Sequence, residues 1–316
     1  MIALSAVLDE TLARCEAALH TPELSDVAAR LLQVGYDADK GVSLVRSTAD
    51  TGEQAPVIRL KKDLEAAGIG HGSGTIADGS LERLLLVNTA LQFIRLVPDL
   101  PVSVDVQRLF YEAFQLFSRP PDKRTHGIFQ AGGSSFLSVC RMATLQRFPA
   151  GEFEWEVTGL PRSWLLQVER RALLRLAAFL VKLGGFSPLL YPHLGALRPK
   201  RIMLVEREIN RSYYRIANSM RLQPKIKGMF AQAWFFSPDT HIVSPHLAWL
   251  TRCFVENGGF VCRMGATSET GDGALSRSNR RKQLYESGEF RPTRGLVLWP
   301  RDAMLRWAAK HPELAD

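Results

Sequence analysis

The side chains best suited to chemistry lie in the last third of the chain, on or beside predicted helices. Tyr285 follows Leu284 and precedes Gly288 by three residues. A glycine just beyond the tyrosine ends the predicted helix. His246, at the start of another predicted helix, offers an imidazole for proton transfer. Tyr285 and His246 are therefore the two candidate catalytic residues.

Positive charge surrounds Tyr285. Between Ser276 and Arg306 there are eight basic residues and three acidic ones. Such a segment suits a ligand that carries phosphate or another anion. The alternative is a solvated helix face that binds nothing. The candidate cofactor-binding residues on the Tyr285 helix are Arg277, Asn279, Arg280 and Arg281.

A second group of chemically capable residues lies earlier in this region. Asp239, His241 and His246 together offer the carboxylate and imidazole ligands that hold a divalent metal. Their spacing differs from the His-x-Asp pair that is usual in non-haem iron sites, and Pro238-Asp239 also suits a simple turn. We therefore predict no metal, and keep a metal-dependent enzyme built on these three residues as an alternative.

The elements that must position these side chains form a regular series. An alternating strand near Phe153–Val157 is followed by one long predicted helix from Pro161 to Leu183 and a second from Glu206 to Met220. Strands then alternate with helices, which predicts an α/β (or α+β) fold with a mixed sheet and flanking helices. The predicted strands are Met229–Phe236, Phe260–Met264 and Gly295–Trp299, and the predicted helices are Pro245–Val255, Ala274–Glu286 and Arg301–Lys310.

The first half of the chain has a different pattern, because helical spacing dominates it. Helices are predicted at Leu4–Leu19, from Ser80 to Ile94 and at Val104–Phe117. We therefore predict a mainly helical region at residues 1–148 and an α/β region at residues 149–316. The two regions are separate domains or share one core.

The Tyr285 helix and the strand after it resemble the C-terminal part of GNAT-superfamily acyltransferases. The residues that carry this resemblance are Asn279, Leu284-Tyr285, Gly288 and Phe290. The resemblance implies N-acyl transfer from acyl-CoA as a co-substrate, with Tyr285 protonating the departing thiolate. The family binds the cofactor pyrophosphate on a basic, glycine-rich turn that begins a helix after a splayed central strand. That turn is expected at Ser237–Leu247, a stretch without glycine or arginine.

Composition limits the other possibilities. The 316 residues carry a net charge of +8 with a pI near 9.5, which favours a small-molecule or anionic ligand. No zinc-finger, helix-turn-helix or RNP-like pattern argues for nucleic acid. Four scattered cysteines without a CxxC pair, no signal peptide and no apolar span predict a cytoplasmic protein. No firmly bound cofactor is expected, and a non-enzymatic scaffold for an anionic partner is the alternative to catalysis.

Overall fold

The computed structural model describes residues 4–66, 79–123, 125–197, 204–266, 273–276 and 278–315. The chain forms two compact units. Unit 1 contains residues 1–154 and 194–203, and unit 2 contains residues 155–193 and 204–316. The predicted domains, 1–148 and 149–316, remain predictions. None of the described helices combines the length and apolar composition needed to cross a bilayer.

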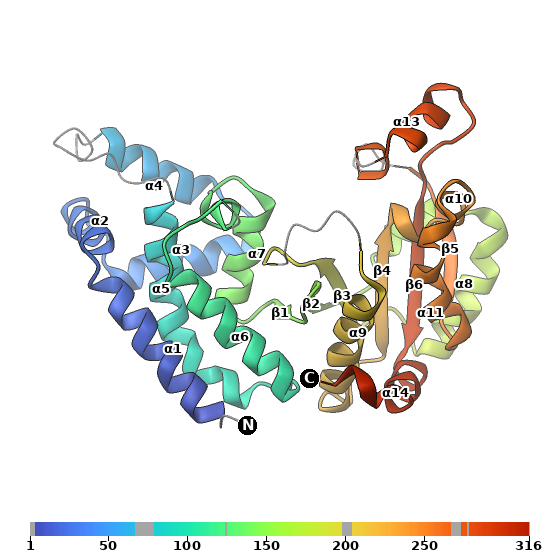
Figure 1. Cartoon of the computed structure of the whole chain (residues 1–316), viewed down its shortest axis with the longest axis horizontal. Coiled ribbons are helices and arrows are strands. Elements are labelled where there is room, and N and C mark those ends of the chain that lie inside the picture. The colour runs from blue at the N-terminus through green and yellow to red at the C-terminus, as the bar shows by residue number, and fades with distance from the viewer. Residues whose placement is uncertain are drawn as a thin grey trace. The chain divides into compact units, whose positions relative to one another are not determined.

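Unit 1 is built from helices packed around α5 (Figure 1). Leucines on several sides of α5 are buried, as expected for a helix that other helices surround. Its contacts include α1, α2, α3, α6 and α7. The helices are α1 (Leu4–Leu19), α2 (Pro22–Gln33), α3 (Ala38–Thr51), α4 (Ala55–Ala66), α5 (Ser80–Phe93), α6 (Val104–Phe117) and α7 (Ser134–Ala143).

The strands form a mixed sheet in the order β1-β2-β3-β4-β6-β5. β3 is parallel to β4, whereas β6 is antiparallel to both β4 and β5. This mixed sheet with flanking helices confirms the predicted α/β class. The strands are β1 (Phe148–Pro149), β2 (Phe153–Thr158), β3 (Leu189–Leu194), β4 (Gly228–Ala233), β5 (Phe260–Met264) and β6 (Arg294–Pro300).

Helices of unit 2 connect these strands. Two short 3-10 helices, η4 (Trp234–Phe236) and η5 (Pro245–Leu247), stand before and after α10 (Pro238–Val243) in the chain. The α-helices are α8 (Arg170–Leu183), α9 (Glu206–Arg221), α10 (Pro238–Val243), α11 (Trp249–Glu256), α13 (Asn279–Glu286) and α14 (Arg301–Ala309).

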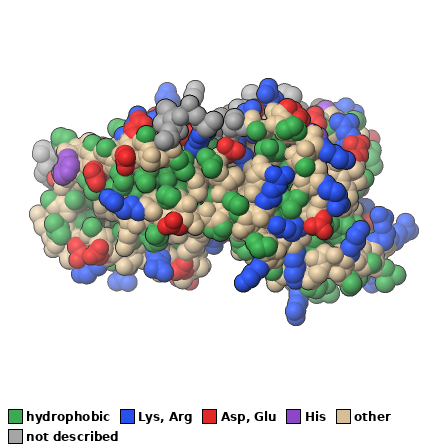
Figure 2. Space-filling view, turned by 90° about the horizontal axis from the view of Figure 1, so that it is seen from below, with side chains coloured by type: hydrophobic (Ala, Val, Ile, Leu, Met, Phe, Trp, Pro, Cys, Tyr) green, Lys and Arg blue, Asp and Glu red, His purple; other side chains and the backbone are tan. Residues whose placement is uncertain are grey.

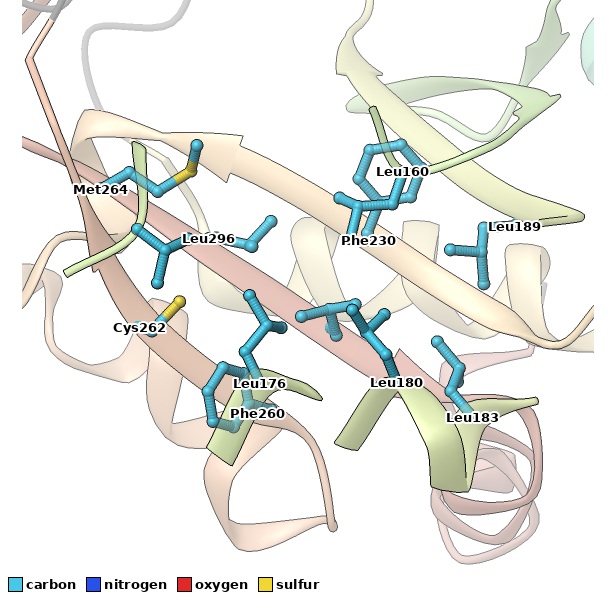
Figure 3. Packing of buried hydrophobic residues seen from close by; sticks show 12 residues of the cluster. Leu160, Leu176, Leu180, Leu183, Leu189, Phe230, Phe260, Cys262, Met264 and Leu296 are labelled. Atoms are coloured by element: carbon cyan, nitrogen blue, oxygen red, sulfur yellow. The ribbon is translucent and has the colours of Figure 1, made fainter. Parts of the chain in front are cut away.

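The core of unit 2 has apolar side chains on both faces of the sheet. On one face, Leu176 and Leu180 of α8 pack in a cluster with Phe230 and Leu296 (Figure 3). On the other, the Trp299 ring meets rings from the surrounding helices, those of Tyr213, Phe254 and Trp307. Large aromatic rings bury much apolar area, so this face is closed by packing.

The predicted helix from Pro161 to Leu183 is wrong in its first part. Residues Arg162–Gln167 form the 3-10 helix η3, and α8 begins only at Arg170. Between them Val168 is extended and forms an antiparallel bridge with Met264, and the Glu169 N–H donates to the Arg263 carbonyl at 3.1 Å. Pairing with β5 therefore overrides the helical spacing at this point.

Candidate functional site

The sheet opens between its two parallel strands. Within the described residues, β3 and β4 are in register at a single position, Leu190 opposite Met229. β4 and β6 pair at six positions, from Gly228 opposite Pro300 to Ala233 opposite Gly295. The C-terminal halves of β3 and β4 thus have no register position with each other among the described residues. An α/β sheet binds ligands at the carboxyl ends of strands where neighbours diverge.

Close backbone approach holds β4 on its other side. A Cβ at Gly228 would lie 2.4 Å from the Trp299 carbonyl oxygen, and one at Gly295 would lie 2.1 Å from that of Phe236. Only glycine fits at such distances. Both ends of the β4–β6 pair therefore require glycine, and β4 has more register positions with β6 than with β3.

A buried arginine strengthens the same side of the sheet. Arg294, the first residue of β6, donates from Nη1 to Gln232 Oε1 at 2.7 Å and from Nε to the Gly265 carbonyl at 3.1 Å. It also donates to Gln167. Its guanidinium thereby joins Gln232 of β4 to Gln167 at the end of η3 and to Gly265 just after β5. The opening in the sheet therefore lies on the side of β4 that faces β3.

Aromatic rings line one face of the sheet where β3 and β4 begin to separate. The Tyr191 and Phe230 rings are stacked, with centroids 4.7 Å apart and planes within 3°. Trp164 presents its edge to both rings, at 6.0 and 5.8 Å. Alternation along β3 places Leu189, Tyr191 and His193 on this face, which Leu189 shares with the cluster of Figure 3.

A histidine and a carboxylate meet at the C-terminal half of β3. His193 Nε2 lies 3.1 Å from Oε1 of Glu156 on β2, and the two side chains are 26% and 22% exposed. The Tyr191 ring meets the imidazole edge-on, with centroids 4.4 Å apart. When Nε2–H is donated to the carboxylate, the basic lone pair is on Nδ1. A partly exposed imidazole held by a carboxylate is the arrangement of a general base.

The chain's thiols are not suited to the same task. All four cysteines are free. Burial raises the pKa of Cys15, Cys253 and Cys262 to about 12, and it raises that of Cys140 as well. Because the thiolate is the reactive form, these side chains are poor nucleophiles at neutral pH.

The structure places the predicted catalytic residues outside this face. Tyr285 is on α13, which follows β5 and precedes β6 along the chain, and the residue is 50% exposed. His246 is on η5 and is also exposed.

The predicted cofactor-binding residues have different surroundings. Arg281 is buried, donates from Nε to the Ala274 carbonyl at 2.6 Å, and lies over the Trp234 ring with Cζ 4.6 Å from its centroid. Burial lowers the pKa of its guanidinium. Asn279 and Arg280 are exposed at the start of α13, and Arg277 lies outside the described residues.

Part of the positive charge of this segment stabilises the fold. Besides Arg281 and Arg294, Arg301 donates from Nη1 to three backbone carbonyls at and after the C-terminal end of α9, those of Met220, Gln223 and Ile226. Among the described basic residues of this segment, Arg281, Arg294 and Arg301 therefore donate hydrogen bonds within unit 2. The sequence alone cannot separate such cations from those that face solvent.

The structure does not assemble the alternative metal site. Asp239 Oδ2 lies 2.9 Å from Arg263 Nε and accepts from Thr293 Oγ1 at 2.6 Å. His241 Nε2 lies 3.0 Å from the Phe235 carbonyl oxygen. Among the described residues there is no group of three or more His, Cys, Asp and Glu side chains that could hold a metal ion.

Sequence reasoning missed His193 and Glu156 because it missed β3. The strand reads Leu-Leu-Tyr-Pro-His-Leu, and a proline inside so short a run argues against a central strand. The available signal was the alternation of Leu189, Tyr191 and His193, directly after the Gly184-Gly185 helix end. The alternating pattern around Glu156 indicates only that this residue lies on the polar side of a strand.

Comparisons with known proteins add one distant likeness. No family model matches the chain, and no curated protein matches it. One solved structure, an acyltransferase in complex with decanoyl-CoA and teicoplanin, is similar with 13% sequence identity and a TM-score of 0.44. The likeness covers 90% of this chain and 86% of that one. At these values it carries no weight in assigning a function.

Proposed function

We propose that this chain is an acyltransferase that moves an acyl group from a coenzyme A thioester to an amine. The observation that carries the proposal is the separation of the parallel strands β3 and β4 after a single register position. In the GNAT superfamily, which the Tyr285 segment resembles, the cofactor is bound beside a splayed central strand. The parallel pair in this sheet provides such a place.

The chemistry of an open strand edge supports this ligand. Among the described residues, β3 and β4 are in register only at Leu190 opposite Met229. An extended ligand with amide groups can add to such an edge as a further strand. The pantetheine arm of coenzyme A is extended and contains two amides, so its thioester end would lie between the strands.

The chain after β3 offers a second candidate for the phosphate-binding turn, beside Ser237–Leu247. The helix that connects the two parallel strands is α9, not the helices after β4. The chain between β3 and α9 reads Gly195-Ala196-Leu197-Arg198-Pro199-Lys200-Arg201, with one glycine and three cations. Residues 198–203 lie outside the described part of the chain, so only their sequence bears on this expectation. This sequence contains the glycine and the cations that Ser237–Leu247 lacks.

His193 and Glu156 supply the base. The amine nitrogen attacks the thioester carbon, the C–N bond forms, and the C–S bond breaks to release the thiolate. The imidazole of His193 accepts the proton that the amine loses, and Glu156 stabilises the imidazolium. The thiolate takes a proton from solvent, and the imidazolium of His193 returns its proton to solvent, which balances the reaction. The resemblance alone would give the protonation of the thiolate to Tyr285, which lies on α13 outside this face.

Titration calorimetry of the whole chain with coenzyme A tests the proposal. We expect one coenzyme A molecule to bind per chain. Pantetheine should bind with lower affinity, because it lacks the phosphates of coenzyme A. An absence of heat up to millimolar coenzyme A would remove the proposal. Polyanion binding in the same assay, without coenzyme A binding, would favour the scaffold alternative.

A further inference from the structure

The outer side of α8 is apolar and exposed. Leu174 and Val181 on this helix are 84% and 82% exposed, and Leu166 on the preceding η3 is 90% exposed. The opposite side of α8 is buried against the sheet through residues such as Leu176 and Leu180. α8 is therefore apolar on more of its circumference than the core uses. Exposed apolar surface of this extent marks a contact with another molecule.

A groove runs along the same surface. It has a volume of about 430 Å³, and its walls include Leu165, Leu173, Leu174, Val181 and Phe186. All its lining residues are apolar or glycine. We call Leu166, Leu174, Val181 and this groove the α8 face.

Cations border the α8 face. The 14 residues of α8 contain Arg170, Arg171, Arg175 and Lys182 and no acidic residue. Helical spacing places Arg171, Arg175 and Lys182 in one row beside the apolar stripe, and all three are exposed. Arg162 lies over the Phe186 ring, with Cζ 5.8 Å from its centroid.

The wider unit has the same sign of charge. Unit 2 contains 22 lysines and arginines and 13 acidic residues, whereas the corresponding counts in unit 1 are 18 and 19. In Figure 2 the blue Lys and Arg side chains gather on the right half of the visible face, among green apolar side chains and fewer red ones. Positive potential around an apolar face attracts an anionic surface.

We propose that the α8 face docks on the surface of an anionic lipid bilayer. Helices that lie in a membrane interface combine an apolar face with a border of Lys and Arg. The leucines and the valine would enter the boundary between headgroups and acyl chains, and the bordering cations would bind lipid phosphates.

Two other occupants fit the α8 face less well. A single acyl chain would fill the groove but leave Leu166, which does not line it, in water. A second copy of this chain packed face to face would bring the cationic rows of two α8 helices together, at a cost in electrostatic repulsion. A bilayer covers all the apolar side chains and also neutralises the cations. The inference does not depend on acyl transfer.

Vesicle flotation with the full chain tests this docking. The probes are vesicles of phosphatidylcholine alone and vesicles of phosphatidylcholine mixed with phosphatidylglycerol. We expect the chain to float with the anionic vesicles, to float less as salt rises, and to stay behind with the neutral ones. The double variant Leu174→Glu, Val181→Glu should lower the apparent partition coefficient by at least about tenfold. Arg171→Glu with Lys182→Glu should lower it for anionic vesicles only.

Matched controls separate the α8 face from general properties of unit 2. Ile242→Glu with Val255→Glu makes the same change at exposed positions on α10 and α11, which are 77% and 59% exposed. Arg306→Glu with Lys310→Glu makes the same change of charge at two exposed positions, one on α14 and one directly after it. Both controls should keep most of the vesicle binding. Unchanged thermal unfolding in every variant shows that the fold is intact.

Three results would overturn the inference. The first is no binding to anionic vesicles, and the second is an equal loss in the control variants. The third is a wild-type dimer in sedimentation velocity that Leu174→Glu with Val181→Glu converts to a monomer. That outcome would assign the α8 face to self-association.

Discussion

His193 Nε2 and Glu156 Oε1 lie 3.1 Å apart, which joins two neighbouring strands of unit 2 through an imidazole and a carboxylate. The pair lies on the part of β3 that follows its single register position with β4, Leu190 opposite Met229. An imidazole in this position has a carboxylate to orient it and stays partly open to solvent. The proposed catalysis therefore makes its sharpest predictions at these two residues.

Replacing His193 by Gln should remove the base and leave the polar surface. We expect kcat for amide formation to fall by about 10²–10⁴-fold, because this is the range that general bases contribute. KM for the acyl thioester should change little, since the imidazole acts on the amine. Steady-state kinetics that follow release of the coenzyme A thiol measure both constants.

The same exchange at His246 provides the comparison, because that residue was predicted from sequence as catalytic. A loss of turnover in His246→Gln with none in His193→Gln would contradict the assignment of the base. Circular dichroism of both variants checks that the fold is kept.

Glu156→Gln should act through His193. The amide can still accept a hydrogen bond from Nε2–H, but it cannot stabilise an imidazolium by charge. We therefore expect kcat to fall less than in His193→Gln, with the double variant no worse than His193→Gln alone. Non-additivity of this kind indicates two residues that act as one unit. Fully additive losses would show that the two side chains act independently.

Arg281 should matter for stability. Arg281→Ala would leave the Ala274 carbonyl without its donor and remove the cation from the Trp234 ring. We expect the free energy of unfolding to fall by roughly 2 kcal/mol or more. The adjacent Arg280→Ala is the matched control, because Arg280 is exposed and its change should stay within about 0.5 kcal/mol.

Urea unfolding followed by tryptophan fluorescence measures both values. Equal stability of the two variants would show that the buried contacts of Arg281 contribute nothing to folding. Coenzyme A titrations on the same samples then show whether either arginine also contacts the cofactor.

Tyr285→Phe tests the role that the resemblance gives to the tyrosine. If this phenol protonates the thiolate, kcat should fall while the affinity for coenzyme A is kept. The loss should be smaller for an acyl donor whose thiol leaving group is more acidic, because such a thiolate needs less help. Unchanged kcat with the natural donor would remove Tyr285 from the mechanism and leave protonation to solvent, to which this half-exposed helix is open.

Much of the fold could be predicted where periodicity is strong and local. Leu4–Leu19, Val104–Phe117 and Phe260–Met264 have the predicted bounds, and α14 ends one residue before its predicted end. These elements have continuous apolar patterns and clear boundaries. The same reasoning failed at Val168, where a tertiary bridge to Met264 interrupts a helical pattern. Local spacing contains no information about a partner almost a hundred residues away.

The candidate site was harder to predict than the fold, because it depends on which strands are neighbours. Glu156 and His193 are 37 residues apart in sequence, and β3 contains Pro192. The expected phosphate-binding turn, Ser237–Leu247, follows β4 and stays a prediction. Once β3 is known to be the parallel neighbour of β4, the sequence before α9 becomes a second candidate for this turn beside Ser237–Leu247.

Hydrogen–deuterium exchange with and without coenzyme A reports where on the chain the cofactor binds. The account predicts that saturating coenzyme A slows exchange of backbone amides in the C-terminal halves of β3 and β4, residues 191–194 and 230–233, since the ligand pairs with their open edges. Slowed exchange on α13 alone, with these two segments unchanged, would contradict it.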